Sequence, residues 1–67
     1  MNNTTNKLRE FRLKAQLTQR AVAKKLGFES HNRICRWENG VAFPSVSNLF
    51  KLSALYGVKP DELYRAK

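Results

Sequence analysis

One stretch constrains the fold of this chain more than any other, because two short helical patterns follow each other across a glycine. The first pattern is Thr-Gln-Arg-Ala-Val-Ala-Lys-Lys-Leu-Gly at residues 18–27, and Ile-Cys-Arg-Trp-Glu-Asn-Gly follows at residues 34–40. Thr18 is a favourable N-cap, and Gly27 can adopt the left-handed conformation that ends a helix. The buried stripe of the first helix is expected at Val22, Ala23 and Leu26. The sequence therefore predicts two short helices joined by a turn.

Helical periodicity predicts another helix before this pair. It spans about residues 5–16, with Thr4 or Thr5 as its N-cap, and its apolar positions are Leu8, Phe11, Leu13 and Ala15. The second helix of the central pair is expected at about residues 31–38, after a cap at Ser30 and before Asn39-Gly40.

Two more helices are expected in the second half. Ser45 caps one that ends at Gly57, and its core face carries Val46, Leu49, Leu52, Ser53 and Tyr56. The last spans residues 59–64, with Pro60 at its first position and acidic residues in its first turn. No strand pattern occurs, so the prediction is a single all-α, five-helix domain over residues 1–67, ordered over about 5–65.

The charge of the chain is high and lies mostly in one half. The net charge is +8 over 67 residues; residues 1–36 carry nine basic and two acidic side chains, and residues 37–67 carry four and three. This asymmetry favours a polyanionic partner, although charge alone does not separate nucleic acid from an acidic protein or an anionic membrane surface.

Other classes of function find little support. The lone Cys35 can form neither an internal disulfide nor a metal cluster, and a reducing cytoplasm is the expected compartment. No apolar run is long enough for a membrane span. One histidine, no paired carboxylates and no glycine-rich phosphate loop argue against an enzyme, and no metal, cofactor or small-molecule ligand is expected.

The helix at residues 31–38 has two faces. Ile34 and Trp37 fall on one side and are expected in the core. His31, Asn32 and Arg36 fall on the other side and carry groups that can hydrogen-bond base edges in a DNA major groove. Cys35 shares this face, and Arg33 lies between the two faces, where a phosphate contact is expected.

The chain resembles the Cro/C1-type, lambda-repressor-like helix-turn-helix family over about residues 5–64. The resemblance rests on residues quoted in order along the chain: Leu17-Thr18-Gln19, Ala23, Leu26-Gly27, Ile34, Trp37-Glu38-Asn39-Gly40, Pro44-Ser45, Leu49, Leu52-Ser53, Tyr56-Gly57-Val58 and Asp61-Glu62-Leu63. It implies a cytoplasmic, bacterial or phage-encoded DNA-binding protein that acts as a two-fold dimer on a palindromic operator, with its third helix in the major groove.

The resemblance also implies roles for single residues. Phosphate contacts are expected at Gln19 in the second helix and near Asn39 and Ser45, and Arg12 with Glu38 matches an ion pair between the first and third helices. Arg20, Ser30 and Arg33 complete the candidate phosphate contacts. Surface for a homodimer is expected in the last third of the chain, at Leu55, Tyr56, Val58, Pro60 and Tyr64.

Two departures from the family pattern affect the expected site. The segment between Gly27 and Ile34 is one residue longer than usual, around Phe28-Glu29, so the first reading residue is either Ser30 or His31. The loop Val41-Ala42-Phe43-Pro44 carries no basic residue, so phosphate contacts there fall to backbone amides.

The most direct functional reading is a sequence-specific transcriptional regulator, and in particular a repressor. The alternative is an antitoxin or adaptor of the same fold that acts mainly through protein–protein contact. An exposed apolar patch beyond the needs of a dimer would favour the alternative, and its candidate residues are Phe43, Phe50 and Leu55.

Overall fold

The computed structural model describes residues 6–64, and these residues form helices connected by short turns. The elements in chain order are α1 (Leu8–Lys14), α2 (Gln19–Leu26), α3 (Asn32–Glu38), α4 (Val46–Tyr56) and the short helix η1 (Pro60–Leu63). The all-helical prediction is confirmed, and no strand occurs among the described residues. No helix in this part of the chain has the length and apolar character needed to cross a membrane.

The predicted short fifth helix, at residues 59–64, corresponds to the 3₁₀ helix η1. Its hydrogen bonds join residues three apart, from Glu62 N–H to Lys59 C=O at 3.0 Å and from Tyr64 N–H to Asp61 C=O at 3.3 Å. The segment has only four residues, and short helices of this length often have the 3₁₀ hydrogen-bond pattern. The described residues therefore form four α-helices and one 3₁₀ helix, and a count of five α-helices is not confirmed.

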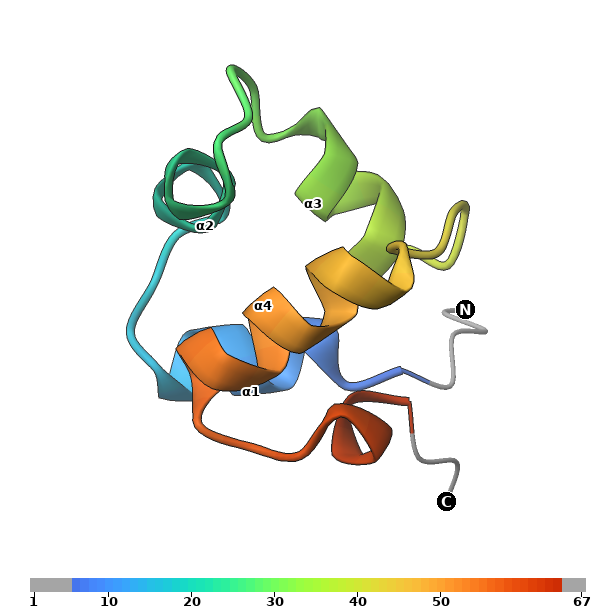
Figure 1. Ribbon diagram of the computed structural model, residues 1–67. Helices are drawn as coiled ribbons and strands as arrows, with labels where there is room; N and C mark the ends of the chain where they lie inside the picture. Colours follow the sequence, from blue (N-terminus) through green and yellow to red (C-terminus); the bar gives the residue numbers. More distant parts are fainter. Residues whose placement is uncertain (1–5, 65–67) are drawn as a thin grey trace.

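Each element contributes one fully buried side chain to the centre of the molecule. In Figure 1, α4 crosses in front of α1, α2 and α3 lie above them, and η1 closes the bottom. The five side chains that meet between these elements are Leu8, Val22, Ile34, Leu52 and Leu63. The domain measures 31 × 24 × 23 Å, so every helix has one face on this core and another on the surface.

The starts of α2 and α4 follow the predicted caps, whereas the N-cap position of α3 is His31 rather than the predicted Ser30. Thr18 Oγ1 accepts a hydrogen bond from the Ala21 N–H at 3.0 Å, and Ser45 Oγ accepts one from the Asn48 N–H at 3.1 Å. The predicted caps of the first helix, at residues 4 and 5, lie outside the described residues. Asn6 Oδ1 accepts a hydrogen bond from the Leu8 N–H at 3.1 Å and so supports the start of α1.

The end of α1 differs from its prediction. α1 ends at Lys14, and Gln16 has a left-handed backbone with φ 62°. The N–H groups of Gln16 and Leu17 donate to the carbonyls of Leu13 and Arg12, the same pattern that Gly27 and Phe28 make after α2. Gln16 therefore ends a helix in the way that glycine usually does, which the sequence does not signal.

The structure also corrects the prediction that Val46 belongs to the core face of α4. The Val46 side chain is 70% exposed. At 100° per residue the buried positions Leu52, Ser53 and Tyr56 cluster on one side of the helix. Val46 lies at the edge of that cluster, rotated toward the exposed Phe50. It therefore points out of the domain beside Phe50.

The residues predicted to offer dimer surface are largely used by the domain itself. Tyr56 is 9% exposed and belongs to the core, so its assignment to a free surface was wrong. Leu55, Val58 and Tyr64 pack against the core, and Pro60 is half-buried. The short η1 helix folds back onto α4, which is why this end of the chain has little apolar surface to spare.

Candidate nucleic-acid interface

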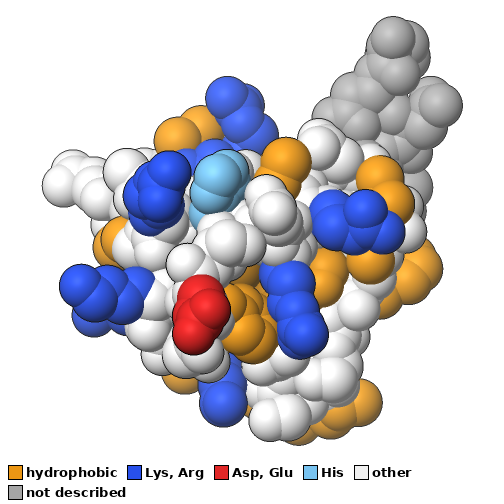
Figure 2. Space-filling model, turned by 90° about the horizontal axis from the view of Figure 1, so that it is seen from above, with side chains coloured by type: hydrophobic (Ala, Val, Ile, Leu, Met, Phe, Trp, Pro, Cys, Tyr) orange, Lys and Arg blue, Asp and Glu red, His pale blue; other side chains and the backbone are white. Residues whose placement is uncertain are grey.

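The outward face of α3 carries long polar side chains, and its inward face is apolar. Ile34 and Trp37 are 1% and 4% exposed, as predicted, while Asn32, Arg33 and Arg36 are exposed. Figure 2 looks down on the face formed by α2, the turn after it and α3; blue basic side chains are spread over this face and red acidic ones are sparse.

The acidic residue of α3 does not reach this outward face. Glu38 is 5% exposed, and its Oε2 accepts a hydrogen bond from Arg12 Nε at 2.7 Å. Arg12 Nη2 donates to Glu38 Oε1 at 3.3 Å, and Nη1 donates to the Leu17 carbonyl at 2.9 Å. The pair therefore connects α1 to α3 and keeps the Glu38 carboxylate away from any partner of α3.

Gln19 joins this buried pair from α2. Its Nε2 donates to Glu38 Oε1 at 3.0 Å, and the side chain is half-buried. An amide nitrogen carries two hydrogens, so one N–H of Gln19 can still donate to another acceptor. Because Gln19 is the first residue of α2, that donor lies beside the free backbone N–H groups of the helix start.

A groove at the start of α2 contains several predicted site residues. It is lined by Arg12, Thr18, Gln19, Arg20 and His31. His31 is half-buried, and its Nδ1 is buried without a hydrogen-bond partner. The structure thus brings His31, a predicted base reader, next to Gln19 and Arg20, two predicted phosphate contacts.

A second groove lies between α3 and the start of α4. It is lined by Arg33, Arg36, Trp37, Ala42, Phe43, Ser45 and Asn48. Its rim combines two guanidinium groups with the N-terminus of an 11-residue helix, and both features attract anions. Arg36 and Ser45, predicted for base and phosphate contact respectively, therefore meet in one groove.

The lengthened turn before α3 has a definite packing. The Phe28 ring meets Trp37 edge-on, with 5.9 Å between ring centroids, and the Arg33 guanidinium carbon lies 4.8 Å from the Phe28 centroid. These contacts hold Arg33 over an aromatic face. α3 itself begins at Asn32, and Ser30 Oγ accepts a hydrogen bond from the Asn32 N–H at 3.3 Å.

Asn39 does not join Ser45, although both were expected near one phosphate. The Asn39 Nδ2 donates to the Cys35 Sγ at 3.3 Å, and Asn39 lines a different groove with residues of α1. Cys35 is a free, half-buried thiol.

Sequence reasoning missed Asn6 and Phe28. Asn6 Nδ2 donates to the Trp37 carbonyl at 3.1 Å, so a residue two positions before α1 contacts the C-terminal end of α3. Asparagine just before a helical pattern is a recognised cap signal, but the pattern gives no sign of its contact with α3. The sequence showed Phe28 only as part of the lengthened turn before α3 and gave no sign of its contact with Trp37.

The arrangement of α2 and α3 defines a helix-turn-helix domain, and comparison with known proteins agrees. A helix-turn-helix family model matches residues 8–63. An "Uncharacterized HTH-type transcriptional regulator MJ0272" from Methanocaldococcus jannaschii is 39% identical over 59 residues, which cover 88% of each chain. No solved structure matches. The chain belongs to the Cro/C1-type helix-turn-helix family.

Proposed function

We propose that this protein is a sequence-specific, double-stranded DNA-binding transcriptional regulator that acts as a repressor by occupying its operator. One observation carries the proposal: α3 presents exposed Asn32, Arg33 and Arg36, while its acidic residue, Glu38, is buried in a pair with Arg12. A helix with this outward surface suits the major groove, which is rich in acceptors and lined by phosphates. The name of the M. jannaschii relative supports the same class of function.

Two kinds of contact are assigned to the interface. Arg36 and Asn32 read base edges, since arginine can bond guanine and asparagine can bond adenine through two hydrogen bonds each. His31 reads at the edge of this set, next to the groove at the start of α2. The proposed phosphate contacts are Gln19, Arg20, Ser30, Arg33, Asn39 and Ser45.

The operator is proposed to be palindromic, with one domain on each half-site. Two α3 helices related by a two-fold axis would then lie about 34 Å apart, one turn of DNA. The antitoxin or adaptor alternative keeps some support from exposed apolar side chains, since Phe43 and Phe50 are 74% and 57% exposed.

Selection of binding sites from random duplex DNA tests this function. The expected result is one enriched motif of two inverted half-sites whose centres lie about 10 base pairs apart. A pool with no enriched motif after several rounds would contradict sequence-specific binding and would favour the protein–protein alternative.

A further inference from the structure

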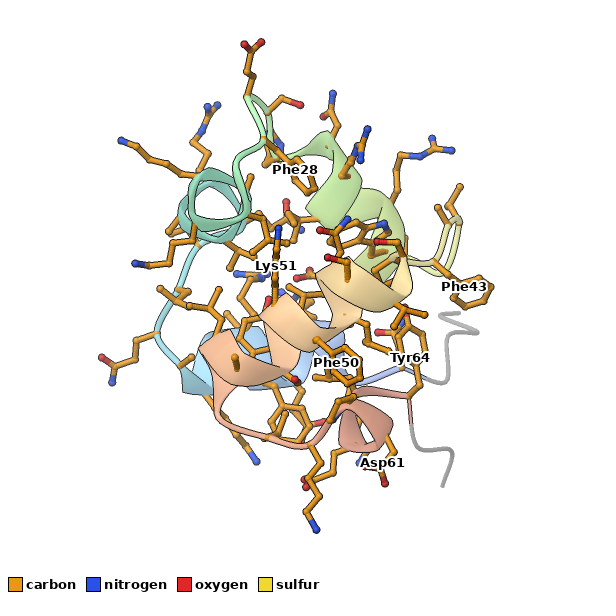
Figure 3. The ribbon with its side chains drawn as sticks, viewed as in Figure 1. Phe28, Phe43, Phe50, Lys51, Asp61 and Tyr64 are labelled. Carbon is orange, nitrogen blue, oxygen red and sulfur yellow. The ribbon has the colours of Figure 1, made fainter. Side chains whose placement is uncertain are left out.

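The Phe28 ring contacts two side chains of α3. It meets the Trp37 ring edge-on, with centroids 5.9 Å apart and an interplanar angle of 73°, and the Arg33 guanidinium carbon lies 4.8 Å from the Phe28 centroid. Figure 3 shows Phe28 just below the turn that leads into α3. Trp37 is buried and Phe28 packs against the core, so the ring that contacts Arg33 has a fixed position.

The charge of Arg33 is not neutralised by the domain itself. Among residues 6–64 its guanidinium makes no hydrogen bond and no ion pair, even with Glu29 in the same turn. A cation is attracted to an aromatic ring through its charge, and this attraction uses none of the five N–H donors of an arginine. Phe28 therefore restrains the exposed Arg33 side chain and leaves all its donors available to an acceptor.

Arg33 and Trp37 also line the groove between α3 and the start of α4, together with Arg36 and Ser45. An arginine that moves freely before binding loses rotamer freedom when it binds, and this loss weakens the complex. Contact with a fixed ring removes part of that freedom in advance. An anion in the groove, such as a DNA phosphate, would therefore meet a guanidinium that is already in place.

We propose that Phe28 is a positioning residue for DNA binding, because its ring holds Arg33 at the groove between α3 and α4, ready for a DNA phosphate. Its effect on affinity rests on the proposed function, whereas the contact between Phe28 and Arg33 is a property of the free protein. Phe28 acts through Arg33 and does not itself contact DNA. The turn that carries Phe28 is the segment that is one residue longer than the usual family pattern, so the added length has a role in binding.

The side-chain NMR signals of Arg33 test the contact in the free protein. Protons held over an aromatic ring resonate upfield, so we expect the Arg33 methylene and Nε protons upfield of those of Arg9, an exposed residue of α1. The shift should remain in Phe28→Tyr and disappear in Phe28→Leu. Arg33 signals that match those of Arg9 in the wild type would overturn the proposal. The wild-type comparison needs no variant, so it decides the contact even where Phe28→Leu does not fold.

A double-mutant cycle tests the effect on DNA binding. Phe28→Leu, Arg33→Ala and the double variant are titrated against the selected DNA site. With Arg33 present, we expect Phe28→Leu to lower the affinity about threefold to fivefold, the contribution of a cation–ring contact at an exposed site. In the Arg33→Ala background the same substitution should change the affinity by less than about twofold. Equal losses in both backgrounds would overturn the proposal, and so would a gain in affinity, because the ring would then hold Arg33 away from DNA.

Two comparisons separate positioning from charge and from stability. The matched control is Phe11→Leu, since Lys14 Nζ lies 5.4 Å from the Phe11 centroid on α1, outside the candidate interface, and DNA affinity should change by less than about twofold. Phe28→Leu retains the Arg33 charge and should keep the salt slope of binding, whereas Arg33→Ala should reduce it by about one. A reduced slope in Phe28→Leu would overturn the proposal. Absence of any enriched DNA motif would instead count against the proposed function, while the NMR comparison would still decide whether Phe28 holds Arg33.

Discussion

Gln19, the first residue of α2, donates a hydrogen bond to Glu38, the last residue of α3, across 3.0 Å. Glu38 is also the partner of Arg12, so one carboxylate holds three helices together. The start of α2 and the reading helix are therefore fixed relative to each other by a buried group. A contact between Gln19 and a DNA phosphate would bear on the placement of α3 as well as on affinity.

Substitution of Glu38 tests this network. Glu38→Gln removes the carboxylate and leaves the buried Arg12 guanidinium without its counter-charge, so we expect a loss of about 3–5 kcal/mol in the free energy of unfolding. The control is Glu10→Gln, because Glu10 pairs with Lys14 on the surface at 3.7 Å and should change stability by less than about 1 kcal/mol. Thermal or urea melts measure both. Equal stability of the two variants would mean that the buried pair is not formed in solution.

Two arginines distinguish base reading from phosphate contact. Arg36→Ala should weaken the best site by about 1–3 kcal/mol and relax the preference at one or two base pairs. Arg20→Ala, the matched control at the start of α2, should weaken all sequences about equally, because a phosphate contact carries no base information. Both variants are titrated against the selected site and its single-base variants. An intact preference profile in Arg36→Ala would identify Arg36 as a phosphate contact.

Salt dependence provides a separate measurement of the phosphate contacts. If each domain neutralises about four to six phosphates, the logarithm of the binding constant should fall with the logarithm of the salt concentration with a slope of roughly −4 to −5 per subunit. Fluorescence anisotropy over a series of salt concentrations gives the slope. A slope near zero, or equal affinity for heparin and every duplex, would be inconsistent with a specific operator complex.

The left-handed Gln16 offers a stabilising substitution. Gln16→Gly should raise the free energy of unfolding by about 0.5–1 kcal/mol, since glycine adopts φ 62° without steric cost. Ala15→Gly is the control, because Ala15 has a right-handed backbone with φ −81°, and glycine there should destabilise the protein by about 0.5–1 kcal/mol. Chemical denaturation compares the two variants. A loss of stability in both would show that the Gln16 side chain matters more than its backbone.

Because the Tyr56 phenol is buried, we expect the protein to lose stability in strong base. Burial raises the pKa of its phenol, the nearby Glu38 charge raises it further, and Arg12 partly opposes these effects. The folded state therefore holds the phenol proton more tightly than the unfolded state, whose pKa is about 10. This contribution is complete below about pH 10 and is lost as the pH rises above it.

Melts of the wild type and Tyr56→Phe at pH 8 and pH 11 measure the Tyr56 effect. The fall in melting temperature between the two pH values should be smaller in Tyr56→Phe, which has no phenol to ionise. Tyr64, whose pKa burial also raises, contributes equally to both proteins. An identical fall in both would exclude Tyr56 as a source of the pH dependence.

The sequence predicted those parts of the fold that local chemistry determines. Thr18, Gly27 and Ser45 set helix boundaries through their own hydrogen bonds or backbone preferences, and the structure has these boundaries. Ile34 and Trp37 were placed in the core by periodicity alone. Gln16 escaped prediction because its left-handed backbone is imposed by the packing of its neighbours rather than by its own preference.

The surface was harder to predict than the core. Val46 and Tyr56 both fit the apolar pattern of α4, and only the docking of η1 and the other helices decides that Val46 is exposed and Tyr56 buried. His31 was predicted for the reading face, and no pattern in the sequence indicated that it would also line the groove at the start of α2. Such positions depend on contacts between distant segments, which helical spacing does not contain.

A backbone hydrogen bond joins the residue before α1 to the last residue of η1, and this contact bears on how the domain is completed during synthesis. The Lys7 N–H donates to the Leu63 carbonyl at 2.7 Å, and the Leu63 side chain is wholly buried. When α1 to α4 of a growing chain have emerged from the ribosome, Leu63, one of the five fully buried side chains at the centre of the domain, is still missing. The core of the domain can therefore be completed only after Leu63 has been added, and we expect a nascent chain stalled before Leu63 to lack the complete core.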